Sequence, residues 1–273
     1  MIHERIFLDK TDERVYIDTY VPNEKGNRPA ILVIPGGGYV NVCTDREGEP
    51  IALAFVEQGF NAFVLNYRVG KEGDVFPKQL IDASRAILYI KENAEKYSTN
   101  PKRVFVTGFS AGGHLTGSVA TMYDYDEIKA EFGDDYLKIK PTGAILCYPV
   151  VSAMESATHL GSFEYLLGKK ISDFSEEERR RYSLEYAARE NSAPMFIWHT
   201  ATDELVPVIG SLSLAKRMAE LKLPLKVSIY PYGTHGVALA NEVTKRNNEN
   251  WLQPMAESWV REAAEFAKTL KDS

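Results

Sequence analysis

The chain has 273 residues, of which 44% are hydrophobic and 26% are charged, as in an ordinary folded globular protein. Its formal net charge of -6 argues against nucleic acid or an anionic membrane as the main partner. No apolar run is long enough to span a membrane, and the first residues do not resemble a signal peptide, so a cytoplasmic location is expected. The two cysteines, Cys43 and Cys147, have neither metal-ligand spacing nor a disulfide pattern.

Segments with strand patterns alternate along the chain with segments that have helix patterns. The first two strands alternate apolar and polar residues and predict an antiparallel hairpin, whereas most others are apolar runs typical of strands buried on both faces. The predicted strands are residues 4–9, 14–20, 30–34, 61–65, 104–107, 143–147, 194–199 and 227–230. The predicted helices are residues 49–58, about 77–93, the segment after 113, 208–221 and about 254–269. This order predicts a mostly parallel sheet with helices on both faces, in a single domain of residues 1–273.

The alternation stops between about residues 151 and 191. Within this segment, Ser175 precedes three glutamates and begins a pattern typical of a capped helix. We interpret the segment as a small helical insertion above the strand ends that shapes a pocket. The polar segment 123–140 is interpreted as a connection.

Three glycines follow the strand at residues 30–34 directly, in the sequence Pro35-Gly-Gly-Gly-Tyr39. Glycines at the carboxyl end of a buried strand suit a phosphate cradle, an oxyanion hole or a plain tight turn. The phosphate motifs are incomplete, because no G-x-x-x-x-G-K-[ST] occurs and Asn41 replaces the third glycine of a dinucleotide fingerprint. Together with the serine described next, the loop is best interpreted as an oxyanion hole that uses the N–H groups of Gly37 and Gly38.

The sequence Gly108-Phe-Ser-Ala-Gly112 matches G-x-S-x-G and lies between a predicted strand and a predicted helix. In that context the pattern predicts a nucleophile elbow, in which Ser110 occupies a sharp turn and the flanking glycines leave room for it. The N–H of Ala111, at the start of the helix, would then complete the oxyanion hole. The alternative is a glycine-rich turn with a solvent-facing serine.

A serine nucleophile needs a base, and the base needs an orienting acid. Asp203 and His235 each follow a predicted strand, so both can meet Ser110 at the carboxyl edge of the sheet. The chain order Ser, Asp, His is also the order found in α/β-hydrolases. The sequence therefore predicts a Ser110–His235–Asp203 triad.

Other titratable residues are interpreted as structural. Among the histidines, His114 and His199 are expected to be packed and His3 and His159 lack supporting context. Glu204 is expected to point away from the site, because it follows Asp203 directly in extended chain. Asp82 is expected to pair with Arg68. Metal chemistry has little support, because neither H-E-x-x-H nor a Cys/His cluster occurs.

The chain resembles the α/β-hydrolase esterases, close to the hormone-sensitive-lipase-like and bacterial acetyl-xylan/feruloyl esterase group. The matching segments occur in family order and are Pro35–Tyr39, Arg46–Pro50, Asn66–Arg68, Gly108–Leu115, His199–Pro207 and Gly233–Gly236. The resemblance implies the α/β-hydrolase fold with an eight-stranded, mostly parallel sheet, and hydrolysis of carboxylic esters without a cofactor. Pro35 stands where the lipase-like members carry histidine, which favours the acetyl-xylan-esterase-like group.

By this resemblance the expected function is a serine esterase that removes short acyl groups, above all acetyl groups, from xylo-oligosaccharides or other sugars. Tyr39 and Val206 are expected to line the substrate pocket, and a dimer is compatible with the sequence. Two alternatives stay open: a peptidase of the oligopeptidase type with the same triad, and a non-catalytic binding protein of the same fold.

Overall fold

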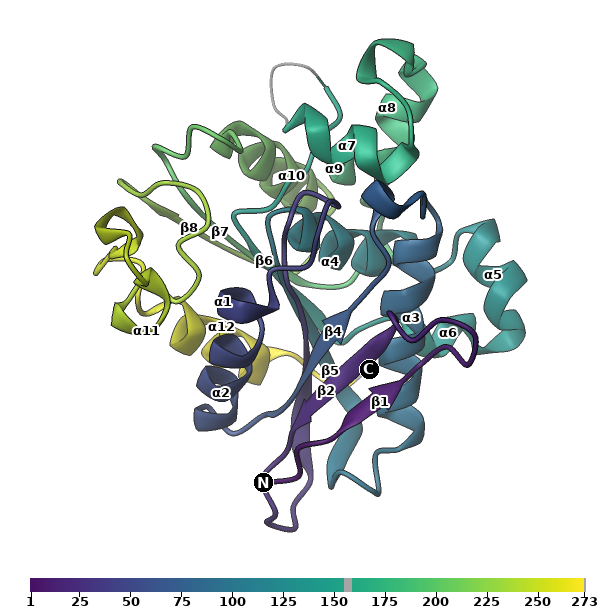
Figure 1. Ribbon diagram of the computed structural model, residues 1–273, viewed down its shortest axis with the longest axis vertical. Coiled ribbons are helices and arrows are strands. Elements are labelled where there is room, and N and C mark those ends of the chain that lie inside the picture. The colour runs from purple at the N-terminus through teal and green to yellow at the C-terminus, as the bar shows by residue number, and fades with distance from the viewer. Residues whose placement is uncertain (155–158, 273) are drawn as a thin grey trace.

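The computed structural model describes residues 1–154 and 159–272, and eight strands of this described part form one sheet (Figure 1). The strands are β1 (Arg5–Phe7), β2 (Tyr16–Tyr20), β3 (Arg28–Ile34), β4 (Asn61–Asn66), β5 (Thr99–Phe109), β6 (Gly143–Cys147), β7 (Met195–Thr200) and β8 (Leu225–Tyr230). Their order in the sheet is β1-β2-β4-β3-β5-β6-β7-β8. The predicted hairpin pairs β1 with β2, and β2 also runs antiparallel to β4. All later neighbours are parallel, as predicted.

Two apolar cores lie on the two faces of this sheet. Successive side chains of a strand point to opposite faces, so Leu32 and Ile34 of β3 enter one core while Ile31 and Val33 enter the other. The first core is covered by α3 (Lys78–Glu92), α4 (Ala111–Met122) and α10 (Val208–Glu220), and the second by α2 (Glu49–Glu57) and α12 (Trp259–Thr269) (Figure 1). Burial on both faces explains why the central strands β3, β4, β6 and β7 contain continuous apolar runs.

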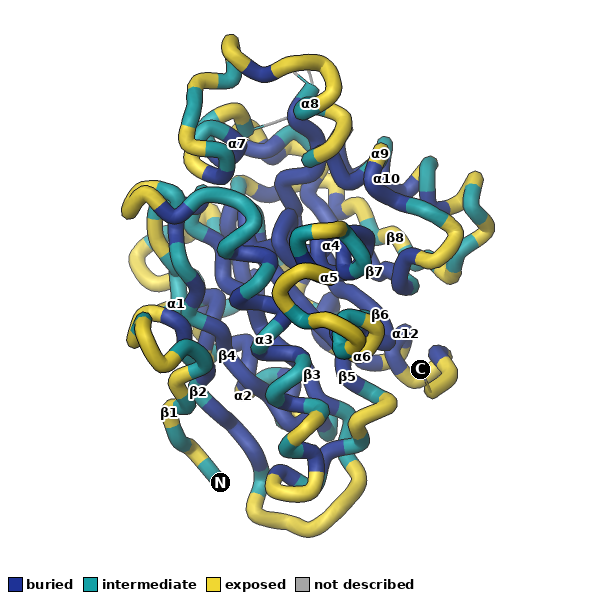
Figure 2. The backbone as a smooth tube through the Cα atoms, turned by 90° about the vertical axis from the view of Figure 1, so that its right-hand side faces the viewer, coloured by how far each residue is buried: buried dark blue, intermediate teal, exposed yellow. Residues whose placement is uncertain are grey.

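The predicted insertion is helical. It contains α7 (Leu160–Leu167), a 3-10 turn at Ile171–Asp173, α8 (Glu176–Tyr182) and α9 (Leu184–Ala187), while its residues 155–158 lie outside the described residues. Both views place α7 and α8 at one extreme of the molecule, at the end opposite β1 (Figures 1 and 2). Helix α8 begins with the predicted cap: Ser175 Oγ accepts from the Glu178 N–H, and the Glu178 carboxylate accepts from the Ser175 N–H.

Several short elements differ from the sequence-based expectations. The polar segment 123–140 is helical, with α5 (Asp126–Phe132), a 3-10 turn at Gly133–Asp135 and α6 (Tyr136–Ile139). The chain also forms α1 (Thr44–Glu47), a 3-10 turn at Gly70–Glu72, α11 (Glu242–Lys245) and a 3-10 turn at Glu249–Trp251. These pieces are too short for an amphipathic repeat to show. Among the described residues, no helix combines the length and apolar character needed to cross a bilayer.

Candidate active site

Ser110 lies in a sharp turn between β5 and α4, where its backbone takes φ 55° and ψ -120°. This conformation is strained for a residue with a Cβ, and such strain is typical of functional positions. The flanking glycines make the turn feasible, because a Cβ at Gly108 would lie 2.3 Å from the Gly112 carbonyl oxygen. A Cβ at Gly112 would lie 2.2 Å from the Ile34 carbonyl oxygen. The predicted strand–turn–helix context of the serine is therefore present.

The glycine loop after β3 lies beside this turn. Gly37 has φ 130°, and a Cβ there would lie 2.0 Å from the Asn41 carbonyl oxygen, so this position requires glycine. The loop is closed by hydrogen bonds from the Val40 and Asn41 N–H groups to the Gly37 carbonyl oxygen. Within the described part of the chain, the N–H groups of Gly37, Gly38 and Ala111 have no hydrogen-bond acceptor. Three unpaired donors near a serine are what an oxyanion needs.

Ser110, His235 and Asp203 form one hydrogen-bonded chain. The Ser110 hydroxyl lies 2.8 Å from Nε2 of His235, and Nδ1 of His235 lies 2.7 Å from Oδ2 of Asp203. Since Nδ1 faces a carboxylate, it carries the proton and leaves Nε2 free to accept the serine hydroxyl proton. The three residues predicted from chain order are thus brought together in the arrangement that activates a serine.

Asp203 is buried and fully occupied by hydrogen bonds. Its Oδ1 accepts from the N–H groups of Leu205 and Val206, and its Oδ2 accepts from His199 as well as from His235. Burial opposes ionisation of this carboxyl group, but the hydrogen bonds from the two histidines outweigh it and hold its pKa below the ordinary value. Asp203 therefore stays ionised and can stabilise a positively charged His235.

His199 has a larger role than the sequence suggested. It is completely buried, and its Nε2 lies 3.0 Å from the Val206 carbonyl oxygen and 3.2 Å from Oδ2 of Asp203. Because both neighbours are acceptors, Nε2 carries the proton and Nδ1 accepts from the Ser211 hydroxyl at 2.8 Å. His199 was expected to be a satisfied core residue, and it is one, but it also donates a hydrogen bond to the Asp203 carboxylate.

Tyr39 and Val206 lie deeper than expected for residues that line a substrate pocket. Both are 1% exposed. The Tyr39 hydroxyl lies 2.9 Å from Nδ1 of His114, whereas Val206 holds Asp203 and His199 through its backbone. This placement does not support the expected substrate contacts, because both side chains are directed into the core. Their exposure could not be inferred from local sequence.

His114 is structural, as expected. Its Nε2–H donates to the Tyr182 carbonyl oxygen at 2.8 Å, and burial lowers the pKa of the imidazole to about 4 although this hydrogen bond opposes the shift. The predicted ion pair of Asp82 with Arg68 is also present, with Asp82 fully buried. His159 lies beside the glycine loop, because its Nδ1 lies 2.9 Å from Oγ of Ser162, and a Cβ at Gly38 would lie 3.9 Å from the same oxygen. Burial, and then the charge of His235, lowers the pKa of this imidazole. No sequence signal marked His159.

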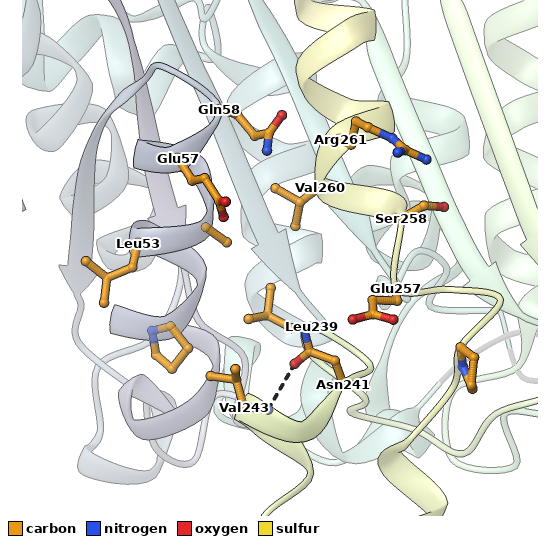
Figure 3. Close-up of a pocket in the computed structure, with 13 residues that line it drawn as sticks. Leu53, Glu57, Gln58, Leu239, Asn241, Val243, Glu257, Ser258, Val260 and Arg261 are labelled. Atoms are coloured by element: carbon orange, nitrogen blue, oxygen red, sulfur yellow. Dashed lines mark hydrogen bonds between the residues drawn. The ribbon is translucent and has the colours of Figure 1, made fainter.

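Two surface hollows differ in their relation to the triad. One of about 300 Å³ has His235 in its wall, and its other lining residues are Thr202, Glu204, Leu205, Thr234, Asn248, Asn250 and Trp251. Another of about 670 Å³ lies between α2, α12 and the segment before α11 (Figure 3), and none of the triad residues lines it. Volume alone would have pointed to the second hollow, whereas of these two hollows it is the first that His235 lines. The wall formed by residues 248–251 was not predicted from the sequence.

The BD-FAE family profile matches residues 17–218 of the chain. The chain is 38% identical over 226 residues to endo-1,4-beta-xylanase B of Butyrivibrio fibrisolvens, which covers 82% of this chain and 34% of that protein. It is 29% identical over 250 residues to an acetylxylan esterase of Xylanibacter ruminicola, which covers 89% of this chain and 48% of that protein. The chain thus spans between a third and a half of the length of these two relatives.

Among solved structures, the acetyl ester-xyloside bifunctional hydrolase from Caldicellulosiruptor lactoaceticus is similar over nearly the whole chain. The TM-score is 0.82 and the identity 30%, and the alignment covers 97% of this chain and 96% of that one. Both the sheet and the helical layers therefore have close counterparts in a known hydrolase.

Proposed function

Because the chain has the α/β-hydrolase fold and belongs to the BD-FAE family of esterases, we propose that it is a serine carboxylesterase that removes acetyl and other short acyl groups from xylo-oligosaccharides or related sugars. The observation that carries the proposal is the hydrogen-bonded chain from Ser110 through His235 to Asp203. A cytoplasmic location and a dimer stay predictions.

The proposed reaction proceeds through an acyl-enzyme. His235 Nε2 takes the proton of the Ser110 hydroxyl while Oγ attacks the ester carbonyl carbon, and the carbonyl oxygen becomes an oxyanion. The N–H groups of Gly37, Gly38 and Ala111 donate to that oxyanion. The protonated His235, stabilised by Asp203, then gives its proton to the departing alcohol oxygen. A water molecule then attacks the acyl carbon while His235 Nε2 takes one of its protons. The bond between the acyl carbon and Ser110 Oγ breaks, His235 returns the proton to Oγ, and the acid leaves.

The alcohol half of the substrate is proposed from the surroundings of His235. The leaving oxygen must lie close to Nε2 of His235, because that nitrogen donates the proton to it. The adjoining hollow is lined mainly by polar side chains and by Trp251, and such a lining suits an alcohol with several hydroxyl groups and an apolar ring face. The names of the xylanase and acetylxylan esterase relatives support the same class of substrate.

The activity can be tested with p-nitrophenyl acetate, butyrate and octanoate. We expect kcat/KM to fall from acetate to octanoate, and Ser110→Ala to lower kcat by several orders of magnitude, because only binding and the oxyanion donors remain. A weak rate that Ser110→Ala leaves unchanged would contradict a catalytic triad and favour a binding protein.

The substrate class needs a separate assay, in which acetate release from acetylated xylo-oligosaccharides is compared with release from insoluble acetylated xylan and with cleavage of short peptides. We expect faster release per ester from the soluble oligomers. Equal rates on the polymer would contradict an oligosaccharide substrate, and peptide cleavage that depends on Ser110 would favour the peptidase alternative.

A further inference from the structure

Glu47 is a buried carboxylate that the proposed reaction does not use. It is the last residue of the short helix α1, just after the glycine loop, and it is 1% exposed. A carboxylate is costly to bury unless each oxygen has hydrogen-bond donors. The hydrogen-bond partners of Glu47 show which segments of the chain it connects.

One oxygen of Glu47 holds the glycine loop. Oε2 accepts from the Gly36 N–H at 2.8 Å, and the Gly36 carbonyl oxygen accepts from the Cys43 N–H. Gly36 directly precedes Gly37, whose N–H is a proposed oxyanion donor. The carboxylate therefore fixes the start of the loop that presents these donors.

The other oxygen of Glu47 leads to the loop that carries the catalytic histidine. Oε1 accepts from the Tyr148 hydroxyl at 2.9 Å, and that hydroxyl accepts from the Ala238 N–H at 3.0 Å. The Tyr148 ring also packs edge-on against His235, with ring centroids 5.1 Å apart. Tyr148 thus contacts His235 directly and binds the chain three residues after it.

Arg46 makes a second connection to the same loop. Its guanidinium group donates to the carbonyl oxygen of Gly236, the residue after His235, and its Nη2 lies 3.7 Å from Oε1 of Glu47. The guanidinium also stacks on Trp251, 4.3 Å from the ring centroid. Two adjacent residues of α1 therefore reach the glycine loop, the histidine loop and the wall of the hollow beside His235.

We propose that Arg46, Glu47 and Tyr148, here called the Glu47 network, are positioning residues that hold the oxyanion donors and His235 at the separation required by the tetrahedral intermediate. The inference rests on the proposed function and deepens it. The intermediate needs donors at its oxyanion and Nε2 of His235 near its leaving oxygen at the same time, yet these groups belong to loops about 200 residues apart in sequence. A displacement of 1 Å between such groups can lower a rate by about a hundredfold.

The test is Glu47→Gln, which keeps the size of the side chain but replaces one acceptor oxygen with an NH2 group facing an N–H or O–H donor. We expect kcat for p-nitrophenyl acetate to fall about ten- to a hundredfold, with KM changed less than about threefold. Tyr148→Phe keeps the ring packed against His235 and removes only the hydroxyl, so it should lower kcat in the same way. The double variant should lose less than the product of the two single losses, because both changes interrupt one path.

The affinity of the folded enzyme for the inhibitor n-propylboronic acid separates a positioning role from a merely structural one, because a loss of stability alone would not change it. Ser110 Oγ adds to the trigonal boron of the inhibitor while His235 Nε2 takes the hydroxyl proton, and the anionic tetrahedral adduct keeps both boron hydroxyl groups and needs the same oxyanion donors. We expect Glu47→Gln to weaken this inhibitor by about the same factor as it lowers kcat/KM.

Asp82→Asn serves as the matched control, because it makes the same chemical change in another buried carboxylate that contacts no residue of the triad. We expect it to lower Tm while leaving kcat and boronate affinity of the folded enzyme unchanged. If Glu47→Gln behaves like Asp82→Asn, the positioning role is overturned. An inactive wild type would overturn the esterase proposal together with this inference, whereas an active wild type with an equally active Glu47→Gln variant would overturn this inference alone.

Discussion

All four hydrogen bonds to the Asp203 carboxylate come from N–H donors. Asparagine has only one oxygen and one NH2 group, so it cannot replace Asp203 without placing a donor against donors. Oδ1 faces two backbone N–H groups, and Oδ2 faces the ring N–H groups of His199 and His235. Whichever way an amide turned, its NH2 group would face two donors. The surroundings of this position therefore favour a carboxylate over an amide.

From this geometry, Asp203→Asn should lower kcat by about 10³- to 10⁴-fold, because His235 loses the partner that fixes its tautomer. The measurement is the steady-state rate on p-nitrophenyl acetate, with the exposed Asp134→Asn as a control that should leave the rate unchanged. A loss of less than about tenfold would contradict the assignment of Asp203 as the acid of the triad.

At the elbow, the backbones of β3, β5 and α4 approach one another closely. The end of β3 lies so near the first turn of α4 that a methyl group at Gly112 would overlap the carbonyl oxygens of Ile34 and Pro35, at 2.2 and 2.3 Å. Backbone groups cannot move aside as flexible side chains can. Helix and strand must separate if a side chain is added.

Gly112→Ala is therefore expected to lower the free energy of unfolding by about 2 kcal/mol or more, and to reduce kcat because the same shift moves Ser110. Denaturant unfolding and the esterase assay measure the two effects. Gly26→Ala is the control, since a Cβ there would lie 3.6 Å from the nearest atom, in ordinary contact. Equal stability of the two variants would contradict the close approach.

A second contact between elements is the ion pair of Arg68, just after β4, with Asp82 of α3. Removing one partner of a buried pair leaves the other charge without compensation, at a cost of about 3–5 kcal/mol. We expect Asp82→Ala to show this loss in denaturant unfolding, and the double variant Arg68→Met/Asp82→Leu to recover most of it. If the double variant is less stable than Asp82→Ala, the explanation by an uncompensated charge is wrong.

The sequence predicted those elements and contacts that a local sequence pattern marks. The buried strands appear as apolar runs, and the order of Ser110, Asp203 and His235, each after a predicted strand, predicted the chain of contacts now seen. Glu47 and Tyr148 were missed because their hydrogen bond joins residues 101 apart, and no local pattern marks such a pair. Tyr39 and Val206 were placed at the pocket because neighbours in sequence lie there, but side-chain direction depends on tertiary packing.

For the whole molecule, stability should depend on pH through groups that are buried in one protonation state. His114 is 2% exposed, and its pKa of about 4 in the folded protein lies below the ordinary value of 6.5. The unfolded chain therefore binds the extra proton between these two pH values, so stability falls as pH decreases from about 6.5 to 4. Asp203, whose pKa is also lowered by folding, adds a loss in the same direction, but only below its unfolded pKa near 3.8.

Accordingly, the free energy of unfolding of the wild type should decrease between pH 6.5 and 4 by up to about 1.4 kcal/mol per pH unit from His114 alone. His114→Gln keeps a donor for the Tyr182 carbonyl oxygen and cannot be protonated. The free energy of unfolding of this variant should therefore decrease less over the same pH range, by the contribution of His114. Urea unfolding at several pH values measures both slopes. Parallel slopes for the two proteins would show that His114 does not cause the acid sensitivity.

The start of β1 and the end of α12 lie well away from α7 and α8, which stand above the carboxyl ends of the strands, and both views agree on this (Figures 1 and 2). An immobilising support or a fused carbohydrate-binding protein could therefore be attached through either terminus without standing in front of Ser110. Immobilisation through α8 would instead place the support above the carboxyl ends of the strands, on the side of the sheet where Ser110 lies.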